Sequence, residues 1–356
     1  MKKILSQDRL AVLREGVVIP ASPLALDENR KWDQFHQKLL YRYYCESGTG
    51  GVAVAVHSTQ FEIRDKQYGL FEPVLSLASE ELKRLESLRN SPILRIAGVC
   101  GKTEQALAEA QTALKLDYDA VLLSLGACKD ESVDALLSHC RQVAEVMPVI
   151  GFYLQPDVGG RVLPYEFWKE FAEIKNVIAI KLAPFNRYRT IDAVRAVAGS
   201  SRRDEITLYT GNDDNIINDL LTPFVFDEHD APVNFVGGLL GQWCVWTSKA
   251  VELLNTIKQI RLSGQAIPVE MYKKAMQLTD ANAAVFDARN AFAGCIPGIH
   301  EVLKRQGLMA TNLCLNPCEV LSEGQAEEID RVSRRYPWLT DDDFVRENIE
   351  VWKREL

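Results

Sequence analysis

The strongest constraint on the fold is a series of eight short apolar runs that recur along the chain. The runs are GVVIPA (16–21), GVAVAV (51–56), ILRIAGV (93–99), AVLLSL (120–125), VIGFY (149–153), VIAIKL (177–182), ITLYT (206–210) and VNFVGG (233–238). Most lack an alternation of polar and apolar residues, which is typical of parallel strands buried on both faces. They are spread over about 220 residues, so the repeat is about 28 residues, the size of one strand–helix unit.

Amphipathic segments that lie between the runs predict helices at 103–116, 131–146 and 165–174. Eight strand–helix units predict an α/β fold of the TIM (β/α)₈ barrel type. A doubly wound open sheet is the alternative, because the apolar pattern alone separates the two poorly. No G-x-G-x-x-G follows the first run, which weakens the dinucleotide-binding form of that alternative.

The pattern changes after the eighth run, and 245–356 reads as mostly helical. This is more chain than the last barrel helix requires. We therefore predict a barrel core at 1–244, with 245–356 forming the last barrel helix and a C-terminal helical extension, the whole a single structural unit. The polar segment 225–232 is predicted to be a surface loop.

Composition narrows the class of partner. Forty-one Lys+Arg against 49 Asp+Glu give a net charge of −8 without a basic stripe, so no nucleic-acid partner is expected. No apolar stretch reaches about 18 residues, and the start of the chain does not read as a secretory signal, so no membrane partner is expected either. The eight cysteines are scattered along the chain, which predicts reduced thiols and a cytoplasmic location. Cys314 and Cys318 are closely spaced, but no second Cys/His pair lies nearby in the sequence, so no metal site is expected.

Lys181 is the most informative polar residue, because it lies inside the apolar run NVIAIKLAP. Active sites of barrels occupy the carboxyl ends of the strands, and lysine is rarely buried unless it is paired or functional. Burial lowers the pKa of a lysine and yields a neutral amine that can attack a carbonyl to form a Schiff base. The alternative is a strand-end lysine whose ammonium reaches solvent or a carboxylate.

Tyr153 ends the preceding run, so its phenol is expected near the amine of Lys181. A phenol there can move protons during carbinolamine formation and carbon–carbon cleavage. The alternative is a tyrosine that packs on the barrel core with its hydroxyl already hydrogen-bonded.

Two further strand ends carry candidate substrate-binding residues. The second run ends in VAVHSTQ, where His57, Ser58 and Thr59 supply donors for a substrate carboxylate, unless this is an ordinary polar turn. Gly237 and Gly238 end the eighth run and either let backbone approach a ligand or make a tight turn.

Several segments together resemble the dihydrodipicolinate synthase / N-acetylneuraminate lyase superfamily of class I aldolases. The landmarks, in order, are GVVIPASPLALDEN, GTGGVAVAVHSTQ, RIAGVCGKTEQALAEAQTALKLDYDAVLLS, PVIGFYLQPDVGG, NVIAIKLAP, YTGNDD and CIPGIHEVLKRQGL. The resemblance covers about 16–321. It implies a (β/α)₈ barrel with added C-terminal helices, usually tetrameric, with Lys181 as the Schiff-base lysine and Tyr153 as the tyrosine of the site.

The sequence also departs from the family pattern. The usual G-T-T-G-E becomes Val-His-Ser-Thr-Gln, which puts His57 and Ser58 in place of the hydroxyl pair and Gln60 in place of the acid. The second tyrosine is replaced near 127–128, and Val158 occupies the position of the synthase's arginine. We therefore predict a divergent member that is not a true dihydrodipicolinate synthase.

The leading hypothesis is a Schiff-base lyase or aldolase that acts on pyruvate or another 2-oxo acid through Lys181, without a cofactor and as a homo-oligomer, either a tetramer or a dimer. A 2-oxo acid or sugar-acid dehydratase would use the same imine. A non-catalytic metabolite-binding barrel is the alternative from another class. A class II aldolase would need a metal held by His57, Asp213 and Asp214, although the two acids after the seventh run favour a helix cap.

Overall fold

The computed structural model describes residues 2–227 and 231–356. Within those ranges, eight parallel strands form one sheet in the order β1-β8-β7-β6-β5-β4-β3-β2. The strands are β1 (Val18–Pro20), β2 (Gly51–Val54), β3 (Leu94–Val99), β4 (Ala120–Leu123), β5 (Val149–Leu154), β6 (Val177–Ala183), β7 (Thr207–Thr210) and β8 (Phe235–Leu240). An isolated parallel bridge from Ala21 to Ala53 joins the two ends of this order. The sheet therefore closes on itself.

The predicted TIM barrel is confirmed, and each strand overlaps one of the eight apolar runs. The strands are buried almost throughout, because helices cover the sheet outside and side chains fill it inside. The last strand differs from its predicted bounds. Val233 forms an antiparallel bridge with Phe224, and the parallel pairing with β7 begins at Phe235.

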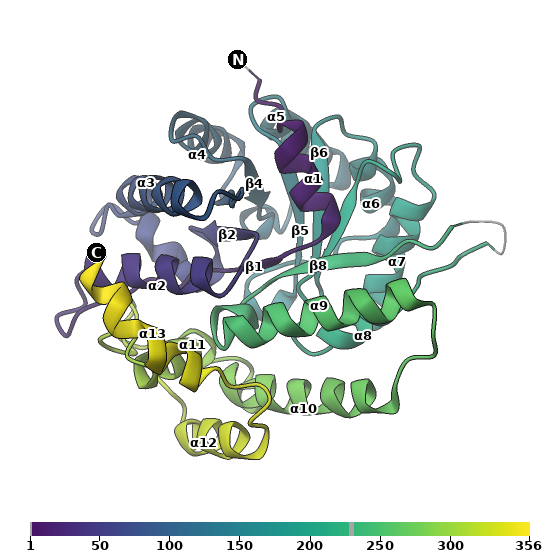
Figure 1. The fold of residues 1–356 in the computed structure, drawn as a ribbon. Helices are drawn as coiled ribbons and strands as arrows, with labels where there is room; N and C mark the ends of the chain where they lie inside the picture. The colour runs from purple at the N-terminus through teal and green to yellow at the C-terminus, as the bar shows by residue number, and fades with distance from the viewer. Residues whose placement is uncertain (1, 228–230) are drawn as a thin grey trace.

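Helices surround the barrel (Figure 1). They are α1 (Gln7–Glu15), α2 (Gln34–Glu46), α3 (Phe71–Arg89), α4 (Thr103–Lys115), α5 (Val133–Ala144), α6 (Tyr165–Ala172), α7 (Arg187–Ala198), α8 (Ile216–Leu221), α9 (Thr247–Ser263), α10 (Val269–Val285), α11 (Cys295–Arg305), α12 (Gln325–Arg335) and α13 (Asp342–Arg354). Side-chain caps fix several starts, as where Ser132 accepts a hydrogen bond from the backbone N–H of Ala135 at 3.2 Å.

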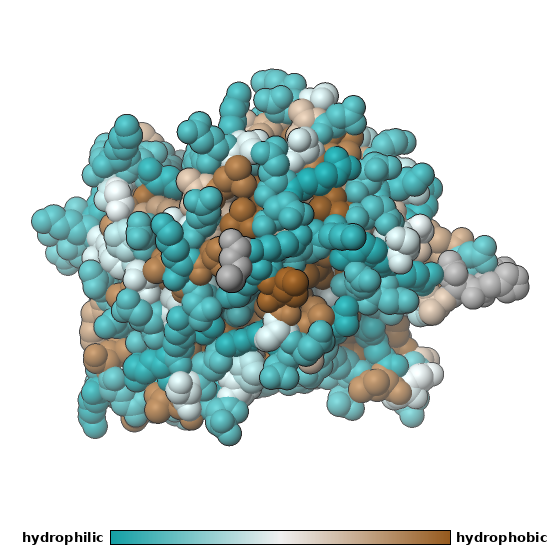
Figure 2. All heavy atoms as spheres, turned by 90° about the horizontal axis from the view of Figure 1, so that it is seen from above, coloured by the Kyte–Doolittle hydropathy of each residue, from teal (hydrophilic) through white to brown (hydrophobic). Residues whose placement is uncertain are grey.

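The helices turn apolar side chains toward the barrel and polar ones outward. In α6, for example, Phe167, Trp168 and Phe171 are buried against the barrel, whereas Glu166 and Glu170 are exposed. The face of the molecule in Figure 2 is covered largely by hydrophilic side chains, with hydrophobic ones in small separate groups. The core therefore lies in and around the barrel.

Helices α10 to α13 follow the last barrel helix, α9, and gather at one end of the molecule (Figure 1). The division into a core at 1–244 and an extension at 245–356 stays a prediction. Part of the predicted loop 225–232, at 228–230, lies outside the described residues. Among the residues described, no helix is both long and apolar enough to cross a membrane.

Candidate active site

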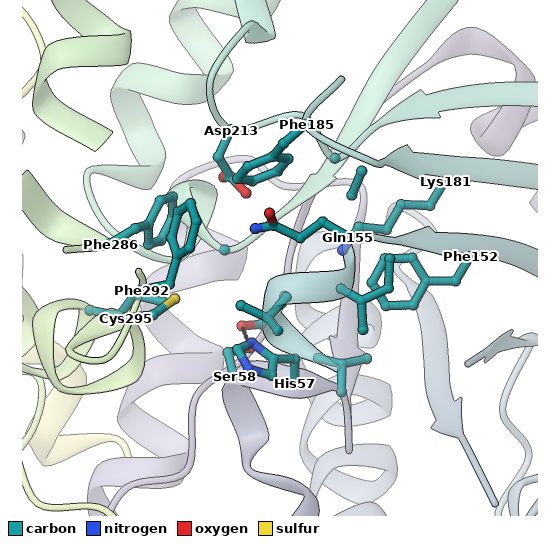
Figure 3. A pocket seen from close by; sticks show the side chains of 18 residues that line it. His57, Ser58, Phe152, Gln155, Lys181, Phe185, Asp213, Phe286, Phe292 and Cys295 are labelled. Carbon is teal, nitrogen blue, oxygen red and sulfur yellow. Dashed lines mark hydrogen bonds between the residues drawn. The ribbon is translucent and has the colours of Figure 1, made fainter. Parts of the chain in front are cut away.

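A pocket lies at the carboxyl ends of the barrel strands, with a volume of about 620 Å³ when its open mouth is included. Lys181 reaches it from β6, while Gln155 and Asp213 follow β5 and β7 (Figure 3). Segments after β1, β2 and β8 add to the wall. The complete lining is Ala21, Val56, His57, Ser58, Phe152, Leu154, Gln155, Val158, Lys181, Ala183, Phe185, Gly211, Asp213, Gly241, Phe286, Phe292, Cys295 and Ile299.

Lys181 is the only lysine or arginine among these lining residues, and its side chain is buried. Its amine forms no hydrogen bond or salt bridge with any residue that the structure describes, and Nζ lies 4.3 Å from the centroid of the Phe152 ring. Burial lowers the pKa of Lys181 to about 8, although the negative charge of Asp213 opposes that shift. A substantial fraction of the amine is therefore neutral near physiological pH.

Asp213 is the negative counterpart of this amine. Burial raises the pKa of its carboxyl group, and the positive charge of Lys181 partly reverses the shift. The backbone N–H of Gln242 donates to Oδ1 at 3.1 Å, and the side chain of Asn282 donates to the Asp213 carbonyl at 2.6 Å. Figure 3 shows the carboxyl group directed into the pocket. Asp213 is therefore an acid–base group that hydrogen bonds fix in position in the same pocket as the amine.

Gly211 makes room for the lysine side chain. A Cβ at this position would lie 2.6 Å from Cε of Lys181 and 2.9 Å from Cβ of Ala183. Real Cβ atoms do not approach carbon so closely, so any larger residue here would displace the chain that carries the amine.

The turn after β2 is only partly a pocket wall. His57 and Ser58 line the pocket, as predicted, but Thr59 does not. The Thr59 hydroxyl donates to the carbonyl of Ser22 at 2.7 Å and accepts from the N–H of Val56 at 3.2 Å. The Thr59 hydroxyl therefore holds the turn together, and substrate binding by Thr59 stays a prediction.

His57 is an uncharged member of the site. Burial, assisted by the positive charge of Lys181, lowers the pKa of His57 to about 4. The neighbouring Ser58 hydroxyl donates a hydrogen bond to the carbonyl of Ala21 at 2.5 Å. This bond holds the Ser58 side chain against the residue that directly follows β1. At neutral pH the imidazole offers one donor and one acceptor rather than a charge.

The phenol of Tyr153 does not reach the pocket, which corrects the predicted pairing with Lys181. The register pairs Lys181 with Phe152, and side chains alternate between the two faces of a strand. Phe152 and Leu154 therefore point inward, whereas Tyr153 packs against Trp168 of α6 with ring centroids 5.2 Å apart. Its hydroxyl donates to the Leu163 carbonyl at 3.1 Å and accepts from the Leu163 N–H at 3.2 Å.

Gly237 and Gly238 do not line the pocket either, and their contact with substrate stays a prediction. A Cβ on Gly237 would lie 2.5 Å from the carbonyl oxygen of Val17, and one on Gly238 would lie 2.7 Å from the ring of Trp243. Both glycines permit close packing inside the protein.

Sequence reasoning missed much of the wall. Gln155 follows a strand directly, so the strand-end rule was sufficient to find it, as it was for Asp213. Phe286, Phe292 and Cys295 come from the chain beyond the barrel, more than a hundred residues after Lys181, and no local pattern marks them. The alternative metal set does not assemble, because Asp214 is absent from the lining and no described group of three His, Cys, Asp or Glu converges.

Comparisons with known proteins find a curated relative and solved structures of similar fold. No protein-family model matches the chain. A 4-hydroxy-tetrahydrodipicolinate synthase from Desulforudis audaxviator is 27% identical over 204 residues. That match covers 56% of this chain and 63% of the relative, so it spans less than two thirds of the curated protein.

Solved structures match over a longer range. A dihydrodipicolinate synthase from Acinetobacter baumannii, complexed with pyruvate, is 17% identical with a TM-score of 0.71, covering 90% of this chain and 98% of that one. CdNal from Clostridium difficile, in complex with mannosamine, is 14% identical with the same TM-score, covering 90% and 99%. At this identity the likeness concerns the fold. Together with the curated relative, these structures make the chain similar to proteins of the dihydrodipicolinate synthase / N-acetylneuraminate lyase superfamily.

Proposed function

We propose that the protein is a class I lyase that forms a Schiff base between Lys181 and pyruvate or another 2-oxo acid. The observation that carries the proposal is the amine itself: buried, directed into a pocket at the strand ends, and free of any ion pair among the described residues. Burial that lowers the pKa of Lys181 supplies the neutral nucleophile that imine formation needs.

The neutral amine attacks the C2 keto carbon of a 4-hydroxy-2-oxo acid, and with one proton taken up, one water leaves as the protonated imine forms. The C3–C4 bond then breaks, its electron pair moves to the imine as an enamine, and the C4 hydroxyl loses its proton to give an aldehyde. Protonation at C3 and addition of one water release pyruvate and restore the amine. Asp213 is the proposed proton carrier, because its raised pKa suits proton exchange near neutrality.

The carboxylate of the 2-oxo acid is placed beside Ser58 and the turn that contains it. This assignment rests on the position of Ser58 and His57 in the lining, across the pocket from Asp213 and Phe185 (Figure 3). Neutral His57 serves as a hydrogen-bond partner in this scheme, since its lowered pKa keeps it uncharged.

Borohydride reduction in the presence of pyruvate tests the proposal. We expect the wild-type protein to gain one reduced pyruvate, located by peptide mass spectrometry at Lys181, and Lys181→Ala to gain none. Lys175→Ala is the matched control, because Lys175 is exposed near the opposite end of the same strand. An adduct that persists at the same level in Lys181→Ala would contradict the assignment.

A specific observation favours one other function, binding without turnover. No phenol lines the pocket among the described residues, so the tyrosine that the family places there has no counterpart. Pyruvate trapping without cleavage of any 4-hydroxy-2-oxo acid would support that function. Turnover that depends on both Lys181 and Asp213 would dismiss it.

Further features of the protein are proposed on the same grounds. Val158 lines the pocket at the position of the synthase's arginine, which supports a divergent enzyme rather than a true dihydrodipicolinate synthase. The eight cysteines are unpaired, which supports a reducing compartment such as the cytoplasm. The family resemblance supports a homotetramer or homodimer, and sedimentation equilibrium of the purified chain, expected near two or four times 40.0 kDa, tests that proposal.

A further inference from the structure

Four phenylalanine rings line the pocket. Phe152 comes from β5, Phe185 follows β6, Phe286 caps the end of α10, and Phe292 precedes α11. Figure 3 shows Phe185 on the side of Asp213, with Phe286 and Phe292 together across the pocket from Lys181. Separate stretches of chain thus bring aromatic rings to one cavity.

Two of these rings are held by an unusual backbone. Phe185 and Phe292 have φ angles of 47° and 66°, in the left-handed region that large side chains avoid. Such a conformation costs about 1–2 kcal/mol per residue. Their rings nonetheless meet edge to face, with centroids 5.8 Å apart. Backbone strain of this kind concentrates at functional sites, which indicates that the position of the two rings serves the ligand.

Neighbouring groups fix both strained residues. The side chain of Asn212 accepts from the N–H of Phe185 at 3.2 Å, and Asn212 itself donates to Asp219 at 2.9 Å. The N–H of Phe292 donates to the carbonyl of Asp287 at 3.0 Å. The aromatic wall is therefore preformed, so a ligand does not have to order it.

The charges in the pocket argue against charged or hydroxyl groups in the part of the substrate beyond C3. Among the lining residues, Lys181 is the only lysine or arginine and is consumed in the imine, while Asp213 would repel a carboxylate. A chain of hydroxyl groups would lie against rings that cannot bond to them, at a cost of about 1–3 kcal/mol for each unpaired group. Besides Lys181, Gln155 and His57 are the polar lining side chains that form no hydrogen bond with another described residue, and two such groups are too few partners for a sugar chain.

We propose that the site takes a 2-oxo acid whose chain carries an uncharged aromatic ring beyond C3, so that the aldehyde partner of pyruvate is an aryl aldehyde. This inference rests on the proposed Schiff-base function and specifies its substrate class. The keto acid end lies at Lys181 and Ser58, and the ring lies among Phe185, Phe286 and Phe292. Edge-to-face contacts between rings add about 0.5–1.5 kcal/mol each beyond the area they bury.

Borohydride trapping with three 2-oxo acids tests the inference: pyruvate, 4-phenyl-2-oxobutanoate with its aromatic ring, and 2-oxoglutarate with its charged tail. We expect adducts at Lys181 with pyruvate and the phenyl acid. Half-maximal trapping by the phenyl acid should need at least about tenfold less ligand than trapping by 2-oxoglutarate.

Phe292→Ala and Phe286→Ala should each raise the concentration of the phenyl acid that gives half-maximal trapping about tenfold more than they raise that of pyruvate. Phe35→Ala is the matched control, because Phe35 is 44% exposed on α2 and does not line the pocket. Two separate variants guard against loss of folding in one.

The outcomes separate the two proposals. Trapping of pyruvate together with equal or preferred trapping of 2-oxoglutarate would overturn the aromatic substrate class and leave the Schiff-base function standing. Equal effects of the phenylalanine variants on all three acids would also overturn it. Absence of any adduct, even with pyruvate, would overturn the Schiff-base function itself.

Discussion

The amine of Lys181 and the carboxyl group of Asp213 form an electrostatic pair inside a buried pocket. Burial destabilises the charged form of both groups, and the charge of each group stabilises the charged form of the other. The two groups therefore titrate as a unit, and a change in one has a predictable sign in the other.

The pH dependence of imine trapping follows from this pair. Because burial lowers the pKa of Lys181 to about 8, the initial rate of pyruvate trapping should rise with pH to a plateau, with its midpoint near 8 rather than near 10.5. Asp213→Asn removes the negative charge that favours the ammonium form, so the midpoint should move to lower pH. Trapping rates measured from pH 6 to 10 in both proteins check the sign.

Asp134→Asn is the control for that shift, because Asp134 is exposed on α5 and does not line the pocket. It should leave the midpoint unchanged. A midpoint that moves upward in Asp213→Asn, or not at all, would show that the carboxyl group does not act on the amine.

Single residues also mark where sequence reasoning stops. Lys181 was predictable because a lysine inside an apolar strand is rare. The phenol of Tyr153 was expected near Lys181 because Tyr153 ends the preceding run, whereas the side of the strand that a residue faces depends on register with the next strand. That register pairs Phe152 with Lys181, and one residue along a strand reverses the face.

At the scale of elements, the strand pattern was sufficient to predict the barrel. Strands such as β6 are continuous apolar runs that need cover on both faces, and eight of them at regular spacing leave few architectures. The wall formed by Phe286 and Phe292 was not predictable, because contacts between α10, α11 and the strand ends join segments far apart in the sequence.

Gly211, in the turn after β7, packs closely against Lys181 of β6. Gly211→Ala should lower the rate of pyruvate trapping at least about tenfold, because the new Cβ would lie 2.6 Å from Cε of Lys181 and push the amine away. Peptide mass spectrometry over a time course measures the rate.

Gly199→Ala is the control for Gly211→Ala. A Cβ at Gly199 would have its nearest neighbour, the carbonyl oxygen of Arg195, at an ordinary 3.7 Å. Circular dichroism should show that both variants fold. A folded Gly211→Ala protein that traps pyruvate at the wild-type rate would contradict the packing argument.

At the scale of the whole molecule, Gln325 connects the C-terminal helices to the mouth of the pocket. Its buried amide donates to the carbonyls of Val285 at 3.1 Å and Gly294 at 3.0 Å, on either side of the segment that carries Phe286 and Phe292. It also accepts from the N–H of Ser322 at 3.1 Å. One side chain thus joins α10, α11 and α12.

Gln325→Ala should therefore lower the free energy of unfolding by about 1–3 kcal/mol, because it leaves buried carbonyls unpaired. It should also raise the concentration of 4-phenyl-2-oxobutanoate needed for half-maximal trapping more than that of pyruvate. Urea denaturation and trapping measure the two effects. Gln265→Ala, at an exposed site, should change neither, and an equal effect on both acids would count against the connection.

The reactive amine and the aromatic mouth come from different parts of the chain. Lys181 belongs to a barrel strand, whereas Phe286, Phe292 and Cys295 belong to the segment that follows α9. Evolution can therefore vary the end of the chain and leave the chemistry at the strand intact. Chimeric proteins that keep this barrel and receive the C-terminal segment of a distant homologue would then inherit that homologue's preference.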